Sequence, residues 1–188
     1  MPLSRQQVRE RARKIKLLLL DVDGVMTDGR IYYIPRSGGG MVETKTFHSR
    51  DGLGIRMARE AGIKVGFITG RSSPAVRYRA KELGLDFLEE NSLDKIDPYQ
   101  RILQAAELTD SEVCYVGDDV VDLPILKRAG LAVGVGNGHP LLRRHVHYLT
   151  HFPGGAGAVR ETIELILDAQ GKWQPIVDRY LRASNAAH

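Results

Sequence analysis

The sequence has only one cysteine, Cys114, in 188 residues, so the chain cannot form an internal disulfide bond. This lack is typical of proteins from a reducing compartment and predicts a cytoplasmic location. The longest apolar run near the start, LLLL at positions 17–20, is far below the roughly 20 residues that span a membrane. The basic segment before it, SRQQVRERARKIK, lacks the apolar core of a secretory signal and predicts a solvated helix. We therefore expect neither a membrane span nor a secretory signal.

Several classes of partner and site are also disfavoured by what is missing. Aromatic residues make up only 6% and no long basic run occurs, so a nucleic-acid partner is not expected. Neither the GxxxxGK[ST] pattern of a P-loop nor the GxSxG pattern of a serine hydrolase is present. The histidines at positions 139, 145, 147 and 151 lack the cysteine partners or HExxH spacing of a zinc site. The net charge of +4 favours a small anionic ligand instead.

Short apolar runs alternate with segments of helical spacing along the chain. The runs are IKLLLL, VGFIT, DFLEE, VCYVG, LAVGV and VHYLT. Pro74 and Pro98 lie where helices should begin, whereas Gly62, Gly84 and Gly130 lie where helices should end. This alternation predicts an α/β fold in which helices cover both faces of a doubly wound parallel sheet. The length suits a single domain over residues 1–188.

Two segments depart from the alternation. Residues of about 30–48 contain two β-prone runs around PRSGGG, which predicts a hairpin inserted after the first strand. A lone hairpin is marginally stable in water, so we expect it to pack on another surface, such as a second subunit. The tail at about 172–188 predicts a helix that frays at its end.

Polar residues follow four of the predicted strands. In an open α/β sheet, the carboxyl ends of the strands form the ligand-binding edge. The sequence therefore predicts that several acids, a hydroxyl and a cation meet at this edge. These residues are Asp21 and Asp23 after the first strand, Thr69, Gly70 and Arg71 after VGFI, Lys95 after FLEENSLD, and Asp118, Asp119 and Asp122 after VCYVG.

Each of these groups taken alone has a structural interpretation. Asp118 and Asp119 could cap the helix that begins near Val120, Thr69 could be a strand residue, and Lys95 could be a solvated surface lysine. Their convergence favours a site, because clustered carboxylates are stable only when a cation or a proton compensates them. Oxygen-only ligands suit Mg²⁺, which keeps waters or substrate phosphate oxygens in its coordination shell.

The same set of groups suits phosphoryl transfer, which needs a nucleophile, a metal and fixed positive charge against the phosphate oxygens. An aspartate can act as the nucleophile and form an aspartyl-phosphate that water then hydrolyses. A second acid can protonate the leaving oxygen and then activate the water. This division of labour explains why the sequence places two carboxylates, Asp21 and Asp23, two positions apart.

The motifs also resemble those of the haloacid dehalogenase (HAD) superfamily. DVDGVMTDG is similar to the first motif of that superfamily, FITGR to the second, Lys95 to the third and GDDVVD to the fourth. The resemblance implies that Asp21 is the nucleophile and Asp23 the general acid and base. It implies that Thr69 and Lys95 hold the phosphoryl group. Mg²⁺ would be bound by Asp21, the backbone carbonyl of Asp23 and Asp118, while Asp119 and Asp122 support the site.

Substrate selection in this superfamily usually depends on inserted cap domains. The intervals between Asp21, Thr69, Lys95 and Asp118 leave no room for a cap, which needs at least about 50 residues of its own. An open site must accept a large substrate or be closed by a neighbouring subunit. The inserted hairpin favours closure by a neighbour.

Longer stretches narrow the resemblance to the capless 3-deoxy-D-manno-octulosonate 8-phosphate (KDO 8-P) phosphatase family. They are FHSRDGLGIRMA, FITGRSSPAVRYRA, YVGDDVVDLPIL and GGAGAVRETIELILDAQGKW. The resemblance implies a homotetramer in which neighbouring chains complete each site. It also implies a role in lipopolysaccharide precursor synthesis. Arginines pair bidentately with phosphate or carboxylate. The substrate-contacting positions implied are Asp23, His48, Ser49, Arg50, Asp51, Gly52, Arg56, Gly70, Arg71, Arg79 and Lys95.

Three alternatives stay open on the sequence. The same chemistry could act on a nine-carbon, sialic-type acid 9-phosphate, although Arg56 and Arg71 favour the eight-carbon acid. A receiver-like signalling domain also has an acid pair, a phosphorylatable aspartate, a threonine and a lysine. Receivers carry that aspartate after the third strand, whereas here the acid pair follows the first. A catalytically idle assembly module is disfavoured because no motif residue is missing.

Overall fold

The computed structural model describes residues 3–185 and has one central parallel sheet. Its six strands run in the order β5-β4-β1-β6-β7-β8, and every neighbouring pair is parallel. Successive strands are added on one side of β1 (β4, β5) and then on the other (β6, β7, β8), so the sheet is doubly wound as predicted from the sequence. The strands are β1 Leu17–Leu20, β4 Lys64–Ile68, β5 Phe87–Glu89, β6 Val113–Gly117, β7 Leu131–Gly134 and β8 Tyr148–Leu149.

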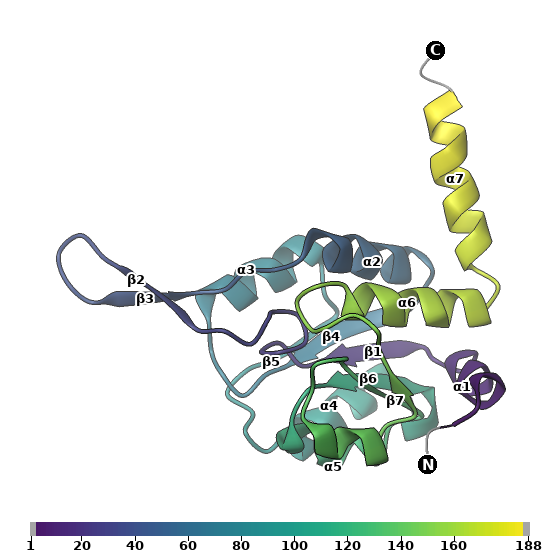
Figure 1. The fold of residues 1–188 in the computed structure, drawn as a ribbon, viewed down its shortest axis with the longest axis horizontal. Coiled ribbons are helices and arrows are strands. Elements are labelled where there is room, and N and C mark those ends of the chain that lie inside the picture. Colours follow the sequence, from purple (N-terminus) through teal and green to yellow (C-terminus); the bar gives the residue numbers. More distant parts are fainter. Residues whose placement is uncertain (1–2, 186–188) are drawn as a thin grey trace.

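Helices cover both faces of the sheet (Figure 1). One layer contains α2 (Ser49–Glu60), α3 (Pro74–Leu83) and α6 (Ala158–Ala169), and the other contains α4 (Ile96–Ala106) and α5 (Leu123–Leu126). Short 3-10 turns occur at Asp110–Glu112, Val120–Asp122 and Pro140–Arg144. No helix in the described part of the chain is long and apolar enough to cross a membrane.

The four leucines of β1 show why this strand lies at the centre. Side chains alternate between the two faces of a strand. Leu18 and Leu20 pack in the core beneath α2, α3 and α6, whereas Leu17 and Leu19 pack in the core beneath α4 and α5. All four are fully buried, so an uninterrupted apolar run is what a strand covered on both faces requires.

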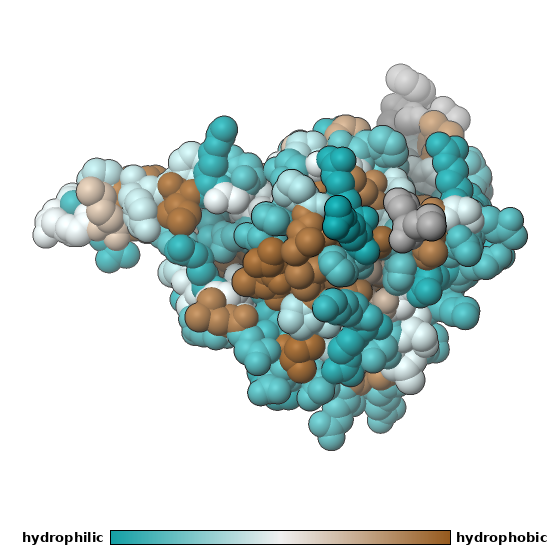
Figure 2. Space-filling view, turned by 60° about the horizontal axis from the view of Figure 1, so that its bottom comes forward, coloured by the Kyte–Doolittle hydropathy of each residue, from teal (hydrophilic) through white to brown (hydrophobic). Residues whose placement is uncertain are grey.

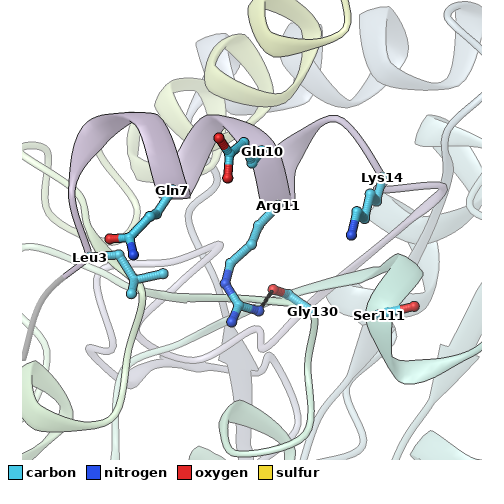
Figure 3. A pocket seen from close by; sticks show the side chains of 7 residues that line it. All are labelled: Leu3, Gln7, Glu10, Arg11, Lys14, Ser111 and Gly130. Carbon is cyan, nitrogen blue, oxygen red and sulfur yellow. Dashed lines mark hydrogen bonds between the residues drawn. The ribbon is translucent and has the colours of Figure 1, made fainter.

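The basic segment at the start forms α1 (Arg5–Ala12), with a capping box between Ser4 and Gln7. Its surface is mostly solvated, but Val8 and Ala12 are buried. Arg11 donates a hydrogen bond of 2.7 Å to the carbonyl of Gly130, which ties α1 to the amino end of β7 (Figure 3). The hollow of about 340 Å³ beside this bond therefore lies at the edge of the sheet opposite the predicted site.

Two elements project from the body (Figure 1). The inserted segment forms an antiparallel hairpin of β2 (Tyr32–Pro35) and β3 (Met41–Thr44), with consecutive glycines of positive φ at its turn. Hydrophobic side chains are exposed along this arm (Figure 2), and Tyr33 and Met41 are 61% and 64% accessible. The tail forms α7 (Trp173–Asn185). The sequence predicts fraying at the end of this helix, and the last positions of that prediction, 186–188, lie outside the described residues.

Candidate active site

The end of β1 delivers the first acid into the interior. Asp21 continues the strand, since its amide donates to the carbonyl of Val116 in β6. Asp21 is 6% exposed, and its carboxylate accepts a 2.7 Å hydrogen bond from the amide of Val22. The chain then turns through Gly24 at φ +92, where a Cβ would overlap the Asp118 carboxylate. Glycine at position 24 therefore allows the acids of β1 and β6 to approach each other.

Lys95 is a buried cation, not a surface lysine. Its ammonium lies 3.0 Å from Asp21 Oδ1 and donates to Asp122 Oδ1 at 2.8 Å and to the Tyr115 hydroxyl at 3.3 Å. Burial alone would lower the pKa of Lys95, but the Asp21 and Asp122 carboxylates together raise it above its usual value. Lys95 thus stays charged and holds the position of Asp21.

Asp122 supports this arrangement from behind. One of its oxygens accepts from Tyr115 and Lys95, and the other accepts from the amides of Asp118 and Asp119 at 2.9 and 3.2 Å. Asp122 is fully buried, and both oxygens are already saturated. Although it lies in the acidic cluster, its ligand capacity is used within the protein.

Asp21 and Asp118 are the acids best placed to bind a cation. Together with Asp122 they bring carboxylate oxygens within 4.8 Å of one another, a cluster typical of a divalent-ion site. Burial, and then repulsion from Asp122, raise the pKa of Asp21 to about 6 despite the opposing charge of Lys95. Burial, and then the Asp21 and Asp122 carboxylates, raise the pKa of Asp118 to about 8. A hard cation would relieve this repulsion, so the donor set fits Mg²⁺.

The other wall of the site comes from the loop after β4. The Thr69 backbone pairs with Glu89 in β5, and its hydroxyl accepts from the amide of Arg71 at 3.3 Å. Thr69 is 1% exposed, and the next two residues, Gly70 and Arg71, line the same hollow as Asp21 and Asp23. The structure thereby brings the second motif beside the first.

A hollow of about 210 Å³ joins these parts at the carboxyl edge of the sheet. Its lining confirms that the strand ends converge, as the sequence pattern predicts. The lining residues are Asp21, Asp23, Gly70, Arg71, Ser92, Leu93, Lys95, Asp118, Asp119 and Val121. Asp119 also caps the following turn by accepting from the amide of Val120, so its structural and site interpretations coexist.

The other predicted substrate contacts lie away from this hollow in the single chain. His48 caps α2 by accepting from the amide of Arg50, and Ser49 is the first residue of that helix. Arg50 stacks over Phe152 at 5.4 Å and donates to the Ala156 carbonyl. Asp51 is fully buried and accepts from the amides of Gly157 and Arg160 at the start of α6. In this chain Asp51 therefore joins two helices.

The remaining arginines of the prediction lie between α2 and α3. Arg79 pairs with Glu82 at 2.6 Å, and its guanidinium fills the space that a side chain at Gly52 would occupy. Arg56 lies 3.9 Å from the same Glu82. Neither arginine lines the hollow within the single chain.

Sequence reasoning missed Lys45 and Glu43. Lys45 follows β3 and is 8% exposed, and its ammonium forms an ion pair with Asp23. Glu43 lies 3.1 Å from Lys45 through one oxygen and 3.1 Å from Arg71 through the other. The stretch ETKTF contains no motif that distinguishes it from a solvated hairpin strand. Only the folded position of the hairpin places these residues beside Asp23 and Arg71.

Comparison with known proteins identifies the family of this chain. The model of the haloacid dehalogenase-like hydrolase family matches residues 48–130. A KDO 8-P phosphatase, KdsC, from Salmonella typhi is 43% identical over 165 residues, which cover 88% of this chain and 86% of the relative. The chain belongs to the KDO 8-P phosphatase family. It is therefore a HAD hydrolase, and the resemblance noted in the sequence is confirmed.

Solved structures of relatives have the same fold. The KDO 8-P phosphatase of Yersinia pestis, at 43% identity, superposes with a TM-score of 0.84 and covers 89% of either chain. The enzyme of Moraxella catarrhalis, at 38% identity, has a TM-score of 0.87, with 93% of this chain and 98% of that chain covered. That structure was determined in complex with magnesium, phosphate and KDO. Neither a receiver domain nor an idle assembly module is favoured by these relatives.

Proposed function

We propose that this protein is a Mg²⁺-dependent phosphatase that hydrolyses KDO 8-P to KDO and inorganic phosphate in lipopolysaccharide precursor synthesis. One observation carries the proposal: the acids and the lysine of the family motifs surround one hollow, in a chain whose Moraxella catarrhalis relative binds magnesium, phosphate and KDO. We place the reaction in the cytoplasm and treat residues 1–188 as one HAD-like domain.

The residue roles that we propose are those implied by the resemblance to the HAD superfamily, and the convergence of Asp21, Asp23 and Lys95 at one hollow supports them. A carboxylate oxygen of Asp21 attacks phosphorus, the bond from phosphorus to the sugar oxygen breaks, and Asp23 gives its proton to that oxygen. Asp23 then takes a proton from water as the water attacks the aspartyl-phosphate, which releases phosphate and restores Asp21. Lys95 and the Thr69 hydroxyl hold the phosphoryl oxygens. A bound Mg²⁺ would be held by Asp21, Asp118 and the Asp23 carbonyl, and would neutralise phosphate charge.

The proposal is tested by measuring phosphate release with and without Mg²⁺ over a set of sugar acid phosphates. We expect the highest kcat/KM with the eight-carbon acid 8-phosphate and loss of activity after chelation by EDTA. Higher kcat/KM with a nine-carbon acid 9-phosphate would overturn the substrate assignment. Turnover that survives complete removal of divalent ions would overturn the metal dependence.

Mg²⁺ is expected to stabilise the protein more at pH 8 than at pH 6. The pKa values of Asp21 and Asp118 are raised above those of an unfolded chain, so without metal the folded state loses stability as pH rises through about 6 and about 8. Mg²⁺ competes with protons for these carboxylates and offsets that loss. Thermal unfolding with MgCl₂, against KCl of equal ionic strength, should show the larger rise in Tm at pH 8. An equal or smaller rise at pH 8 would contradict this assignment, and Asp118→Asn should remove the rise.

We further propose that the protein is a homotetramer in which the hairpin contacts neighbouring chains and the sites are completed there. The exposed Tyr33, Ile34 and Met41 on the arm support this, as do Arg50, Arg56 and Arg79, which lie away from the hollow in the single chain. The double variant Tyr33→Glu/Ile34→Glu should dissociate the oligomer, because two charges would replace apolar contact surface. Sedimentation velocity measures this, with the exposed Gln104→Glu as a control. An unchanged oligomer, or a fully active monomer, would contradict the proposal.

A further inference from the structure

Lys45 links the hairpin to the acid that handles the proton. It lies directly after β3, at the root of the arm, and its side chain is only 2% exposed. A buried ammonium is costly unless opposite charges surround it. Its partners are Asp23, with which it forms an ion pair, and Glu43 at 3.1 Å. Asp23 side-chain accessibility is 29%, so this carboxylate lies at the boundary between the buried cation and the open hollow.

The ion pair with Lys45 engages one carboxylate oxygen of Asp23 and leaves the other oxygen available. Lys45 donates to Oδ1, and within the described part of the chain Oδ2 has no hydrogen-bond partner. A carboxylate held on one oxygen keeps one orientation, so its second oxygen is available for proton exchange with the leaving group or with water. The ammonium also compensates the negative charge that Asp23 carries after it has given up its proton.

Lys45 is itself fixed by neighbours that belong to the site wall. Glu43 shares its carboxylate between Lys45 and Arg71, each at 3.1 Å. Arg71 lines the hollow and follows Thr69 in the loop after β4. A chain of alternating charges, Asp23, Lys45, Glu43 and Arg71, therefore runs from the first motif through the hairpin to the second.

We propose that Lys45 is a positioning residue that orients Asp23 for proton transfer, an inference that rests on the proposed phosphatase function. Lys45 acts through Asp23, so its loss should impair the step that needs a proton donor. Alkyl phosphates such as sugar phosphates need that proton because the departing alkoxide is strongly basic. The nitrophenolate of an aryl phosphate such as p-nitrophenyl phosphate is a weak base and departs without that proton.

The test compares these two substrates in the variants Lys45→Met and Lys45→Arg, with Lys64→Met, an exposed lysine at the far edge of the sheet, as the control. For the alkyl phosphate, Lys45→Met should lower kcat by about tenfold to a hundredfold, the range for a misplaced catalytic group, with KM changed less than about threefold. With p-nitrophenyl phosphate in excess, the pre-steady-state burst of nitrophenolate should keep a near-normal rate. Lys45→Arg should restore most of the alkyl activity, and Lys64→Met should match the parent.

The outcomes distinguish the proposed role of Lys45 from the proposed function of the protein. An unchanged kcat for Lys45→Met on the alkyl phosphate would overturn the role of Lys45. So would an equal loss on both substrates, because general damage to the fold lowers both rates together. Any alkyl phosphate that the parent protein accepts can serve in the comparison. Failure of the parent on the sugar acid phosphate would therefore overturn only the proposed substrate.

Discussion

Replacing Asp21 by asparagine is expected to abolish phosphate release. The amide is a poor nucleophile, so no aspartyl-phosphate can form, and loss of a covalent nucleophile lowers kcat by at least about 10⁴-fold. The fold should survive, because the remaining amide oxygen can still accept the hydrogen bond from the Val22 amide. A steady-state phosphate-release assay measures the loss, and sedimentation velocity checks that the oligomer is intact.

The matched control is Asp168→Asn, which removes a carboxylate from the exposed pair with Arg9 on the far side of the fold. Exposed ion pairs contribute about 0–1 kcal/mol, so this variant should keep normal turnover and nearly normal stability. Near-normal turnover in Asp21→Asn would remove the nucleophile assignment. Labelling with ³²P-substrate then asks where phosphate resides, since only protein that retains Asp21 should become labelled.

Replacing Lys95 by methionine is expected to damage both activity and stability. Lys95 contacts Asp21 and Asp122 in the interior, and both carboxylates would lose their counter-charge. Breaking a buried ion pair from one side costs about 3–5 kcal/mol, which corresponds to a fall in Tm of roughly 10 °C for a domain of this size. Loss of a fixed cation against the phosphoryl oxygens should lower kcat/KM by about 10²- to 10³-fold.

Differential scanning calorimetry and the phosphate-release assay measure the two effects, with the exposed Lys127→Met as the control. Mg²⁺ should recover part of the lost Tm in Lys95→Met, because a divalent ion supplies positive charge to the same acids. It should recover less of the activity, since the ion and the ammonium occupy different positions. A variant with unchanged Tm and kcat/KM would show that Lys95 is not coupled to the acids.

Most of the fold was predictable because it depends on local patterns. The alternation of apolar runs and helical segments follows from burial on both faces of β1, and Gly84 ends α3 in the left-handed conformation as expected. The basic segment forms the predicted helix, but it is only partly solvated, because Val8 and Ala12 pack against the core. No local sequence pattern predicts this contact, because the residues that Val8 and Ala12 pack against are distant in sequence.

The candidate site was predictable in part for the same reason. Acids placed just after parallel strands must meet at one edge, so the neighbourhood of Asp21, Lys95 and Asp118 follows from the strand pattern. The saturation of Asp122 by backbone amides and Tyr115 does not follow from it. Nor does the position of Asp51, whose partners at the start of α6 lie more than a hundred residues away.

The local chemistry of the chain is enough to specify strands, helices and the order in which reactive groups reach the sheet edge. This is because strand burial and helix capping are settled among near neighbours in sequence. Which groups touch depends on packing between distant segments, as with Gly24 and Asp118 or Lys45 and Asp23. Electrostatic energy varies steeply with separation and burial, so only the folded structure decides that Lys95 is a buried counter-ion and Lys45 a neighbour of the proton donor.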